Sequence, residues 1–172
     1  MKDGLNALYE RRSVRKYKSE QISDGELEQI LKAGLCAPSA MNRQPAIIIA
    51  VQDKGTIAYM SKLNAQVMGS NGDPFYGAPT VLVVLAEADN ANAVKDGSLV
   101  LGNLMNAASA LGIGSCWVNR AQEVFASAEG KSLLEKWGVQ GDYIGVGNCI
   151  LGYPAETPAA KPIKGNRLYY VR

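Results

Sequence analysis

Apolar residues recur along this chain in two spacings, one typical of helices and one of strands. After Ser23 they follow a helical spacing as far as Leu35, and Ser23 with Glu26 forms the S-x-x-E pattern of a helix start. We expect this helix to end just before Pro38, because the residue preceding a proline avoids helical geometry. The same spacing predicts three further helices, over residues 5–10, 57–68 and 131–137.

Continuous apolar runs predict strands that are buried on both faces. The clearest are residues 47–51 and 81–85, and residues 115–118 and 144–151 are further candidates. Strands that alternate with helices indicate a layered α/β or α+β architecture. The C-terminal tail contains Pro154, Pro158 and Pro162, so we expect it to be extended, with residues 168–171 forming an edge strand.

The longest predicted helix covers about residues 91–111. Its residues are apolar or small on nearly every face, a pattern typical of a helix buried on all sides. A chain of 172 residues offers little material to surround such a helix. We therefore expect it to lie in a subunit interface.

Composition narrows the chemistry that the chain can perform. It contains no histidine, which excludes a Ser-His-Asp triad, a Cys-His pair and an HExxH zinc site. Its three cysteines, Cys36, Cys116 and Cys149, lie far apart without a CxxC spacing, which argues against a disulfide framework, a metal site or an iron–sulfur cluster. If the protein is an enzyme, a bound cofactor should therefore carry the chemistry.

Charge and apolar run length bear on partners and location. Lys and Arg number 18 against 16 Asp and Glu, and this net charge of +2 does not by itself indicate nucleic-acid binding. The apolar runs are far shorter than the roughly 20 residues that a membrane helix needs, and charged residues interrupt the N-terminus. We expect a soluble, cytoplasmic protein.

The first candidate site is a basic stretch that carries five of the 18 basic residues between Arg11 and Lys18. It could be a solvated turn, a nucleic-acid surface or a phosphate site. Guanidinium groups bind phosphate oxygens bidentately, and Arg11, Ser13 and Arg15 share one side of an extended segment. No phosphate-binding glycine loop is present, so side chains would have to hold the phosphate.

Three other segments carry candidate binding residues. The loop over residues 38–45 offers uncharged amide and hydroxyl groups that suit a flat heterocycle, although turn residues are equally common in an ordinary connector. Residues 111–119 contain glycines and Trp117, which also fit a helix cap and a core position. Lys164 and Arg167 could bind an anion or belong to a solvated C-terminus.

Together these segments carry a resemblance to a known family. RRSVRKY at residues 11–17, APSAMNRQP at 37–45, FYGAP at 75–79, LGIGSCW at 111–117 and GYP at 152–154 occur in the order and spacing of the FMN-dependent nitroreductase family. The chain looks like one of its short-chain members, and the resemblance runs from about residue 5 to residue 172.

The resemblance implies an α+β fold of three layers, with a mixed, mainly antiparallel central sheet flanked by helices. Residues 1–172 would form a single domain whose extended C-terminal arm, about residues 154–172, embraces a second subunit. The expected assembly is an intertwined homodimer with FMN bound at the interface.

The resemblance also implies which residues bind FMN, including a loop contributed by the other subunit. Arg15 would lie where it can stabilise negative charge on the ring. The expected FMN-binding residues are Arg11, Arg12, Ser13 and Arg15 on the basic segment, Pro38, Ser39, Asn42 and Gln44 on the partner's loop, Asn64, Trp117, Val118 and Asn119 beside the ring, and Lys164 and Arg167 at the phosphate.

The activity implied is that of an FMN-dependent NAD(P)H oxidoreductase that reduces nitroaromatic or quinone-type acceptors by ping-pong hydride transfer through the flavin. Two positions depart from the family pattern: Ala46 replaces the usual aromatic residue after QP, and Asn119 stands where longer relatives carry another residue. Ala46 keeps open the alternative of a non-catalytic flavin-handling module, and specialised ene-reductase or dehalogenase chemistry on the same scaffold is a further alternative. We expect no nucleic-acid or membrane partner.

Overall fold

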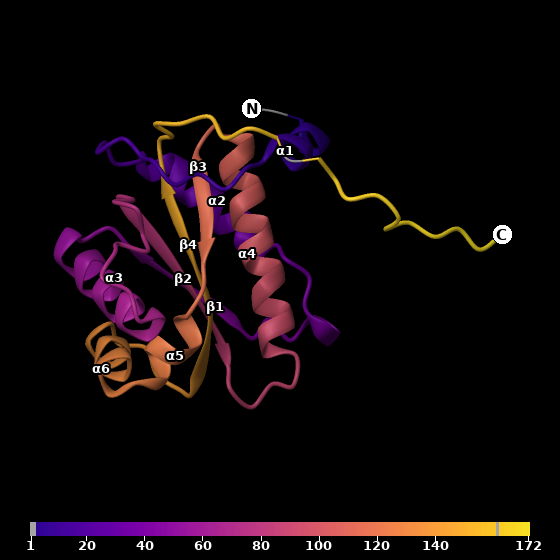
Figure 1. The fold of residues 1–172 in the computed structure, drawn as a ribbon. Helices are drawn as coiled ribbons and strands as arrows, with labels where there is room; N and C mark the ends of the chain where they lie inside the picture. The colour runs from indigo at the N-terminus through magenta and orange to yellow at the C-terminus, as the bar shows by residue number, and fades with distance from the viewer. Residues whose placement is uncertain (1–2, 161) are drawn as a thin grey trace.

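The computed structural model describes residues 3–160 and 162–172, so residues 1 and 2 of the expected domain and Lys161 of the expected arm lie outside the described part. Helices and strands follow one another as the apolar spacing predicts, apart from a 3-10 turn over residues 40–42 and a short helix over residues 121–126 (Figure 1). In chain order they are α1 (Gly4–Glu10), α2 (Asp24–Leu35), the 3-10 turn η1 (Ala40–Asn42), β1 (Ala46–Val51), α3 (Lys54–Met68), β2 (Thr80–Glu87), α4 (Ala93–Ala110), β3 (Gly114–Val118), α5 (Ala121–Ala126), α6 (Ala128–Lys136) and β4 (Tyr143–Gly152).

The four strands form one sheet in the order β1-β2-β4-β3. Every pair of neighbouring strands is antiparallel, with one irregularity in register between β2 and β4. The expected mixed character is confined to a single parallel bridge, between Ser13 and Ser115 on the outer edge of β3. This bridge places the basic segment against the sheet.

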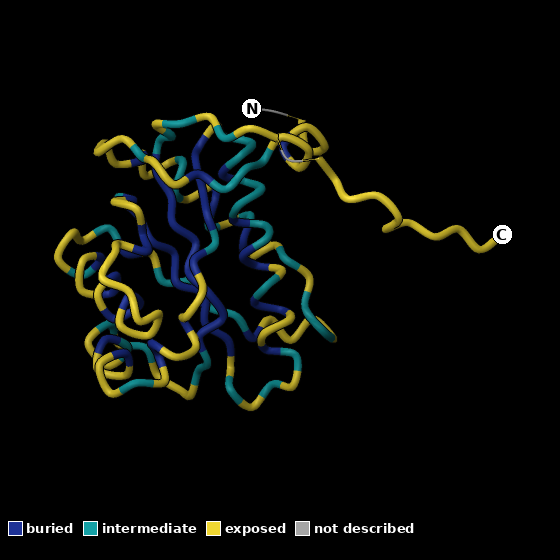
Figure 2. The backbone as a smooth tube through the Cα atoms, viewed as in Figure 1, coloured by how far each residue is buried: buried dark blue, intermediate teal, exposed yellow. Residues whose placement is uncertain are grey.

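Strand β2 shows why the fold has three layers. Its residues alternate between two cores: Val81, Val83 and Leu85 face α3, α5 and α6, whereas Leu82, Val84 and Ala86 face α2 and α4. Neighbouring side chains on a strand point to opposite faces, so a continuous apolar run is stable only when both faces are covered. Figure 2 shows the resulting buried centre between two helical layers.

Glycines on β4 let its neighbours approach closely. A Cβ at Gly145 would lie 2.2 Å from the Ala121 carbonyl oxygen, so α5 packs directly on the strand backbone. A Cβ at Gly147 would lie 2.7 Å from Trp117 Nε1, so the indole ring rests over this position on the α4 side of the sheet. Both approaches exclude a larger residue.

The capping box at the start of α2 is confirmed: the Ser23 hydroxyl accepts the Glu26 backbone N–H, and the Glu26 carboxylate accepts the Ser23 backbone N–H. The helix ends at Leu35, as Pro38 predicts.

Helix α5 was not predicted, because it has only six residues and begins after Arg120, whose left-handed φ of 79° is not signalled by a glycine.

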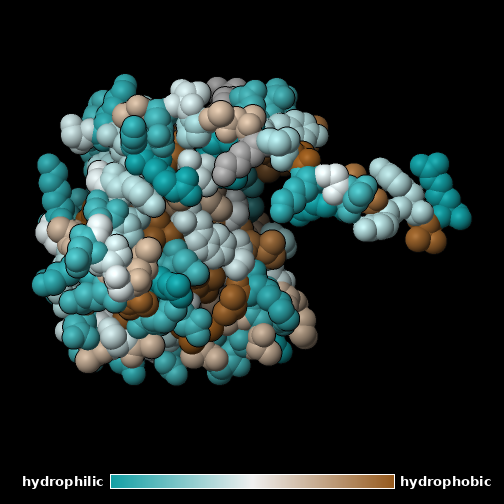
Figure 3. Space-filling model, viewed as in Figure 1, coloured by the Kyte–Doolittle hydropathy of each residue, from teal (hydrophilic) through white to brown (hydrophobic). Residues whose placement is uncertain are grey.

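Helix α4 is buried along one face by its own chain, and Val94 and Leu99 on its other side are about half exposed. Its expected place in a subunit interface, which would cover that side, stays a prediction. The edge strand expected near the C-terminus is wrong. Residues 168–171 form no strand, because their backbone lies in an exposed arm with no neighbouring strand to pair with (Figures 1 and 3).

Within the described residues, no helix combines the length and apolar character needed to cross a membrane.

Candidate functional site

The basic segment is held in place by backbone hydrogen bonds to distant parts of the chain. Val14 N–H donates to the Ser115 carbonyl oxygen (3.0 Å), and Lys18 N–H donates to that of Tyr153 (2.9 Å). The Val14 side chain is buried against Gly114, where a Cβ would lie 3.0 Å from it. The segment therefore lies along the outer edge of β3 in a fixed register, with alternate side chains directed outward.

Tyr17 makes a hydrogen bond within the basic segment. Its hydroxyl donates to the Val14 carbonyl oxygen at 2.6 Å. Burial is the main cause that raises the pKa of this hydroxyl far above its usual range, so it stays protonated and remains a donor. Tyr17 has a structural role here and offers no acid or base to a substrate.

The three arginines of the segment have different surroundings. Arg12 Nη1 donates to the carbonyl oxygens of Tyr9 and Arg11, both at 2.8 Å, and so closes the C-terminal end of α1. The Arg11 side chain makes no hydrogen bond or ion pair with the described residues, and it lines a hollow of about 390 Å³ together with Arg12 and the first residues of the arm. Arg11 is therefore the better placed to receive an anion.

Arg15 lies farther along the segment. Its backbone N–H donates to Glu156 Oε1 at 2.6 Å, and its guanidinium carbon is 5.9 Å from the centre of the Tyr76 ring. Tyr76 itself has a left-handed φ of 54° in the turn that follows Asp73. The Asp73 carboxylate fixes this turn by accepting N–H groups from Phe75 (2.9 Å) and Gly77 (2.6 Å).

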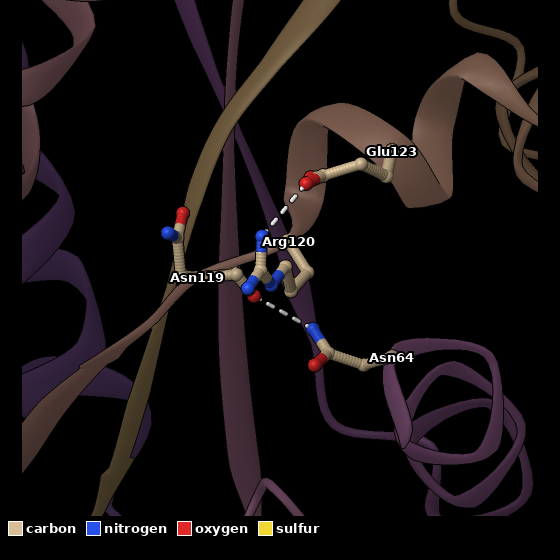
Figure 4. Close-up of polar contacts among 4 residues, drawn as sticks. All are labelled: Asn64, Asn119, Arg120 and Glu123. Carbon is tan, nitrogen blue, oxygen red and sulfur yellow. Dashed lines mark hydrogen bonds and ion pairs between the residues drawn. The ribbon is translucent and has the colours of Figure 1, made fainter. Parts of the chain in front are cut away.

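Asn64 of α3 has one satisfied and one unsatisfied hydrogen-bonding atom in its side chain. Its side chain is 1% exposed, and its Nδ2 donates to the Asn119 carbonyl oxygen at 2.8 Å (Figure 4). This bond fixes the orientation of the amide, so Oδ1 is the acceptor end, and Oδ1 is buried without a donor among the described residues. A buried acceptor without a donor is costly and calls for a physical explanation.

The end of β3 supplies the rest of this region. Val118 is buried in the core on the α3 side, so only its backbone could contact a ligand, whereas Trp117 faces α4. Asn148 of β4 lies opposite Val118, on the same face of the strand as Ile150. Its Oδ1 is also buried and has no hydrogen-bond donor among residues 3–160 and 162–172. Beside Asn119, Arg120 pairs with Glu123 at 3.0 Å on the surface (Figure 4).

The loop over residues 38–45 adopts an uncommon backbone. Met41, Asn42 and Gln44 have left-handed φ values of 54°, 53° and 49°. The Ser39 hydroxyl accepts the Gln44 N–H (2.9 Å), and Gln44 Nε2 donates to Asn42 Oδ1 (2.9 Å). Non-glycine residues in this conformation are strained, and such strain gathers at functional sites. Pro38, Asn42 and Gln44 are all exposed.

Within one chain the loop and the basic segment do not meet, because α4 separates them. The loop contacts the first turn of α4, where the Asp96 carboxylate accepts the Ala40 N–H. The other end of α4 is joined to α1, since the Ser109 hydroxyl donates to the Ala7 carbonyl oxygen at 3.2 Å. At 1.5 Å per residue, the 13 residues between Asp96 and Ser109 correspond to about 20 Å.

Lys164 and Arg167 are not brought to the basic segment. Both lie exposed on the arm, which extends away from the body (Figure 1). A larger hollow of about 710 Å³ between α3 and residues 70–79 contains none of the predicted site residues. In the single chain, the predicted residues therefore form two separate groups and an unattached arm.

Four residues with contacts to these groups were not among the predicted ones: Tyr76, Asp96, Asn148 and Glu156. Tyr76 lies in the FYGAP segment that contributed to the resemblance, but no role was assigned to it. The other three contact residues far away in sequence, so no local pattern signals them. Only the packing of the sheet and the helices reveals them.

Comparison with known proteins identifies the family of this chain. The sequence model of the nitroreductase family matches residues 8–74 and 65–153, which together exceed half of the chain. The chain belongs to the nitroreductase family. A relative from Archaeoglobus fulgidus, provisionally named NADH dehydrogenase/NAD(P)H nitroreductase, is 35% identical over 162 residues, covering 91% of this chain and 88% of its own.

Solved structures show the same nitroreductase fold. A nitroreductase with bound FMN from Bacteroides fragilis superposes with a TM-score of 0.91 at 27% identity, covering all of both chains. Another with bound FMN, from Desulfitobacterium hafniense, superposes with a TM-score of 0.89 at 27% identity, also over all of both chains. The three-layer α+β architecture expected from the sequence is confirmed for this nitroreductase.

Proposed function

We propose that this nitroreductase is an FMN-dependent NAD(P)H oxidoreductase, a single domain whose arm over residues 154–172 reaches a second subunit. Its family, the FMN bound in its structural relatives and the NAD(P)H in the names of its sequence relatives support this proposal. The structural observation that carries it is the buried, unpartnered Oδ1 of Asn64.

The donor groups of the basic segment fit the phosphate of FMN. Arg11 lines a hollow without an ion-pair partner among the described residues, and the Ser13 hydroxyl lies two residues farther along the same extended segment. A phosphate dianion is held best by charge-assisted hydrogen bonds from guanidinium groups. Arg12 contributes charge while its Nη1 holds the end of α1. Lys164 and Arg167 are proposed to reach this phosphate from the arm.

Asn64 fits the pyrimidine part of the flavin. That part of the ring carries an N–H donor flanked by carbonyl oxygens, and Asn64 offers an acceptor whose own amide is already fixed by Asn119. Trp117, the Val118 backbone and Asn119 are proposed to line the ring. Arg15, held by Glu156 and Tyr76, is proposed to stabilise negative charge there.

The positions of the two groups support a homodimer. Pro38, Ser39, Asn42 and Gln44 lie at the opposite end of α4 from Arg11, so one chain cannot bring both groups to one flavin. A second copy related by two-fold symmetry could place its loop over the first copy's basic segment. Exposed apolar residues suit such an interface: Leu5, Leu8, Tyr9, Val94 and Leu99.

Bound FMN would supply the redox chemistry, hydride acceptance from a nicotinamide followed by reduction of an acceptor. The chain contains no histidine, so its contribution is to bind, orient and charge-stabilise rather than to transfer protons at neutral pH. We propose a ping-pong order and nitroaromatic or quinone acceptors. Ala46 leaves more room beside the loop than an aromatic residue would, which suits bulky acceptors.

An absorption spectrum of the purified protein tests the proposal directly. We expect a flavin band that bleaches anaerobically with NADH or NADPH and returns when a quinone or nitroaromatic is added. A band that neither nicotinamide bleaches would favour a flavin-handling module. The absence of binding after incubation with FMN would overturn the proposal. Parallel double-reciprocal plots with varied nicotinamide and acceptor would support the ping-pong order, and intersecting plots would contradict it.

Mixed dimers test the shared site. A chain carrying Arg11→Ala has a weakened basic segment and an intact loop, whereas a chain carrying Ser39→Ala and Asn42→Ala has the reverse. If each flavin lies between two subunits, co-expression should restore one intact site in every heterodimer, although both parent homodimers bind FMN poorly. No recovery in purified heterodimers, or a monomer by light scattering, would contradict the shared site.

A further inference from the structure

Asp96 is a buried charged residue with no role in the function proposed so far. Its side chain is 4% exposed, and among the described residues it is the only Asp, Glu, Lys or Arg that is buried. A buried carboxylate is costly unless donors compensate it. Asp96 lies in the first turn of α4, where the helix dipole favours a negative charge.

The hydrogen-bond partner of Asp96 belongs to the loop over residues 38–45. The Ala40 N–H donates to both carboxylate oxygens, at 3.2 Å each. Ala40 stands directly after Ser39 and two residues before Asn42, which are both proposed to contact FMN. A buried charge on the body of the protein is thus bonded to the centre of this loop.

Two hydrogen bonds join the loop to the body: Glu87 N–H donates to the Pro45 carbonyl oxygen at the loop's C-terminal end (3.1 Å), and Ala40 N–H donates to Asp96 farther inside the loop. Among the described residues, every other hydrogen bond made by residues 38–44 closes within the loop itself, as between Ser39 and Gln44 or between Asn42 and Ser39. Three of these residues have strained, left-handed backbones. A strained conformation persists only when its surroundings hold it, and Asp96 is the side chain that does so from outside.

We propose that Asp96 is a positioning residue of the flavin site, which fixes Ala40 and thereby presents Ser39, Asn42 and Gln44 to the partner subunit's FMN. The inference rests on the proposed function. It also gives α4 a role as a spacer, because one end holds the loop through Asp96 and the other end holds α1 through Ser109.

Two substitutions and one control test this role. Asp96→Ala removes the acceptor for Ala40 N–H, whereas Asp96→Asn keeps an oxygen acceptor of similar shape. Asp89→Asn is the matched control, because Asp89 is exposed, precedes α4 and makes no hydrogen bond that involves the loop. The first measurement is amide hydrogen exchange in the FMN-free protein, comparing residues 38–45 with the core strand β2. The second is the FMN dissociation constant, with the KM of a quinone acceptor measured alongside kcat.

Loss of one charge-assisted hydrogen bond should raise loop exchange and weaken FMN binding by about 10-fold each in Asp96→Ala. Asp96→Asn should restore most of the affinity, to within about 3-fold of the unaltered protein. Exchange in β2 should not change, and the acceptor KM should rise more than kcat falls. Asp89→Asn should match the unaltered protein in every measurement.

Four outcomes would overturn the proposal, and the last would overturn the proposed function with it. Unchanged loop exchange in Asp96→Ala would show that the carboxylate does not hold the loop. Equal increases in the loop and in β2 would show that Asp96 serves only general stability. Faster loop exchange with unchanged FMN affinity and KM would show that the loop does not contribute to the flavin site. The proposed function would still stand in that case, provided that the unaltered protein binds FMN and its flavin band is bleached by nicotinamide. If the unaltered protein bound no FMN, both proposals would fail.

Discussion

The two groups of proposed flavin ligands are built in opposite ways. The group around Arg11, Ser13 and Asn64 rests on the sheet: a bridge to Ser115 and the bond from Asn64 to Asn119 fix it within one chain. The loop around Asn42 is exposed and strained, and apart from the Glu87–Pro45 backbone bond at its end, a buried carboxylate holds it to the body. The first group is fixed within one chain in a conformation that could bind the flavin, whereas the second is exposed and could contact the flavin of another subunit.

Because of this difference, we expect substitutions in the first group to affect FMN binding and substitutions in the loop to affect stability. Substitutions in the sheet-bound group remove contacts that a ligand would make and leave the chain's own contacts largely intact. Substitutions in the loop change the backbone conformation itself. Substitutions at Arg11, Asn64, Met41 and Glu123 test this contrast.

The largest effect is expected from Arg11→Ala. Loss of a charge-assisted bond to phosphate should weaken FMN binding about 10- to 100-fold. The unfolding temperature of the FMN-free protein should not change, because the Arg11 side chain makes no hydrogen bond or ion pair with the described residues. Fluorescence titration and thermal unfolding measure the two effects. Lys131→Ala, on the exposed surface of α6, controls for the lost charge. Unchanged FMN affinity would remove Arg11 from the site.

A smaller loss is expected from Asn64→Leu. FMN affinity should fall about 10-fold, which corresponds to one hydrogen bond of about 1.4 kcal/mol. The free energy of unfolding without FMN should change by less than about 1 kcal/mol, because removing the unpartnered Oδ1 offsets the lost bond to Asn119. Gln66→Leu, on the exposed side of α3, is the control. A variant that is strongly destabilised but binds FMN normally would contradict the assignment.

The loop can be tested at Met41, which is 83% exposed and has a φ of 54°. Met41→Val should lower the free energy of unfolding by about 1 kcal/mol, because a β-branched residue resists the left-handed region. Met41→Gly should have little effect, since relief of strain offsets the greater entropy of glycine in the unfolded chain. Denaturant unfolding of both variants provides the measurement. Equal stabilities would show that the loop adopts another backbone in solution.

The smallest effect is expected next to the sheet-bound group, from Glu123→Gln. The pair with Arg120 is exposed on both sides, so its loss should change the free energy of unfolding by less than about 0.5 kcal/mol. FMN affinity should stay within twofold, as measured in the same titration. A large loss of affinity would instead give the Arg120–Glu123 pair a role in holding Asn119.

Local patterns predicted most of the fold. The Ser23–Glu26 capping box and the continuous apolar run of β2 encode structure within a few neighbouring residues, and both are confirmed. Helix α5 escaped prediction because nothing local distinguishes the left-handed Arg120. The strand expected at residues 168–171 is wrong because a strand requires a neighbour, which no local pattern supplies.

The site was less predictable than the fold. The order of the motifs indicated the basic segment, the loop and Asn64 through a family resemblance. It could not indicate that Asn64 Oδ1 lacks a donor or that Asp96 contacts Ala40, since 56 residues separate Asp96 from Ala40 in the sequence. Whether the predicted residues bind FMN stays a prediction until the titrations are made.

The anchoring of the basic segment has a consequence for the order of folding. Its arginines leave the ribosome before Ser115 and Tyr153, whose backbone groups fix the segment. Contacts between residues so far apart in sequence form late, because the entropy of closing a long loop must first be overcome. The segment proposed to bind phosphate is therefore synthesised before its anchors and becomes ordered only after both have been made.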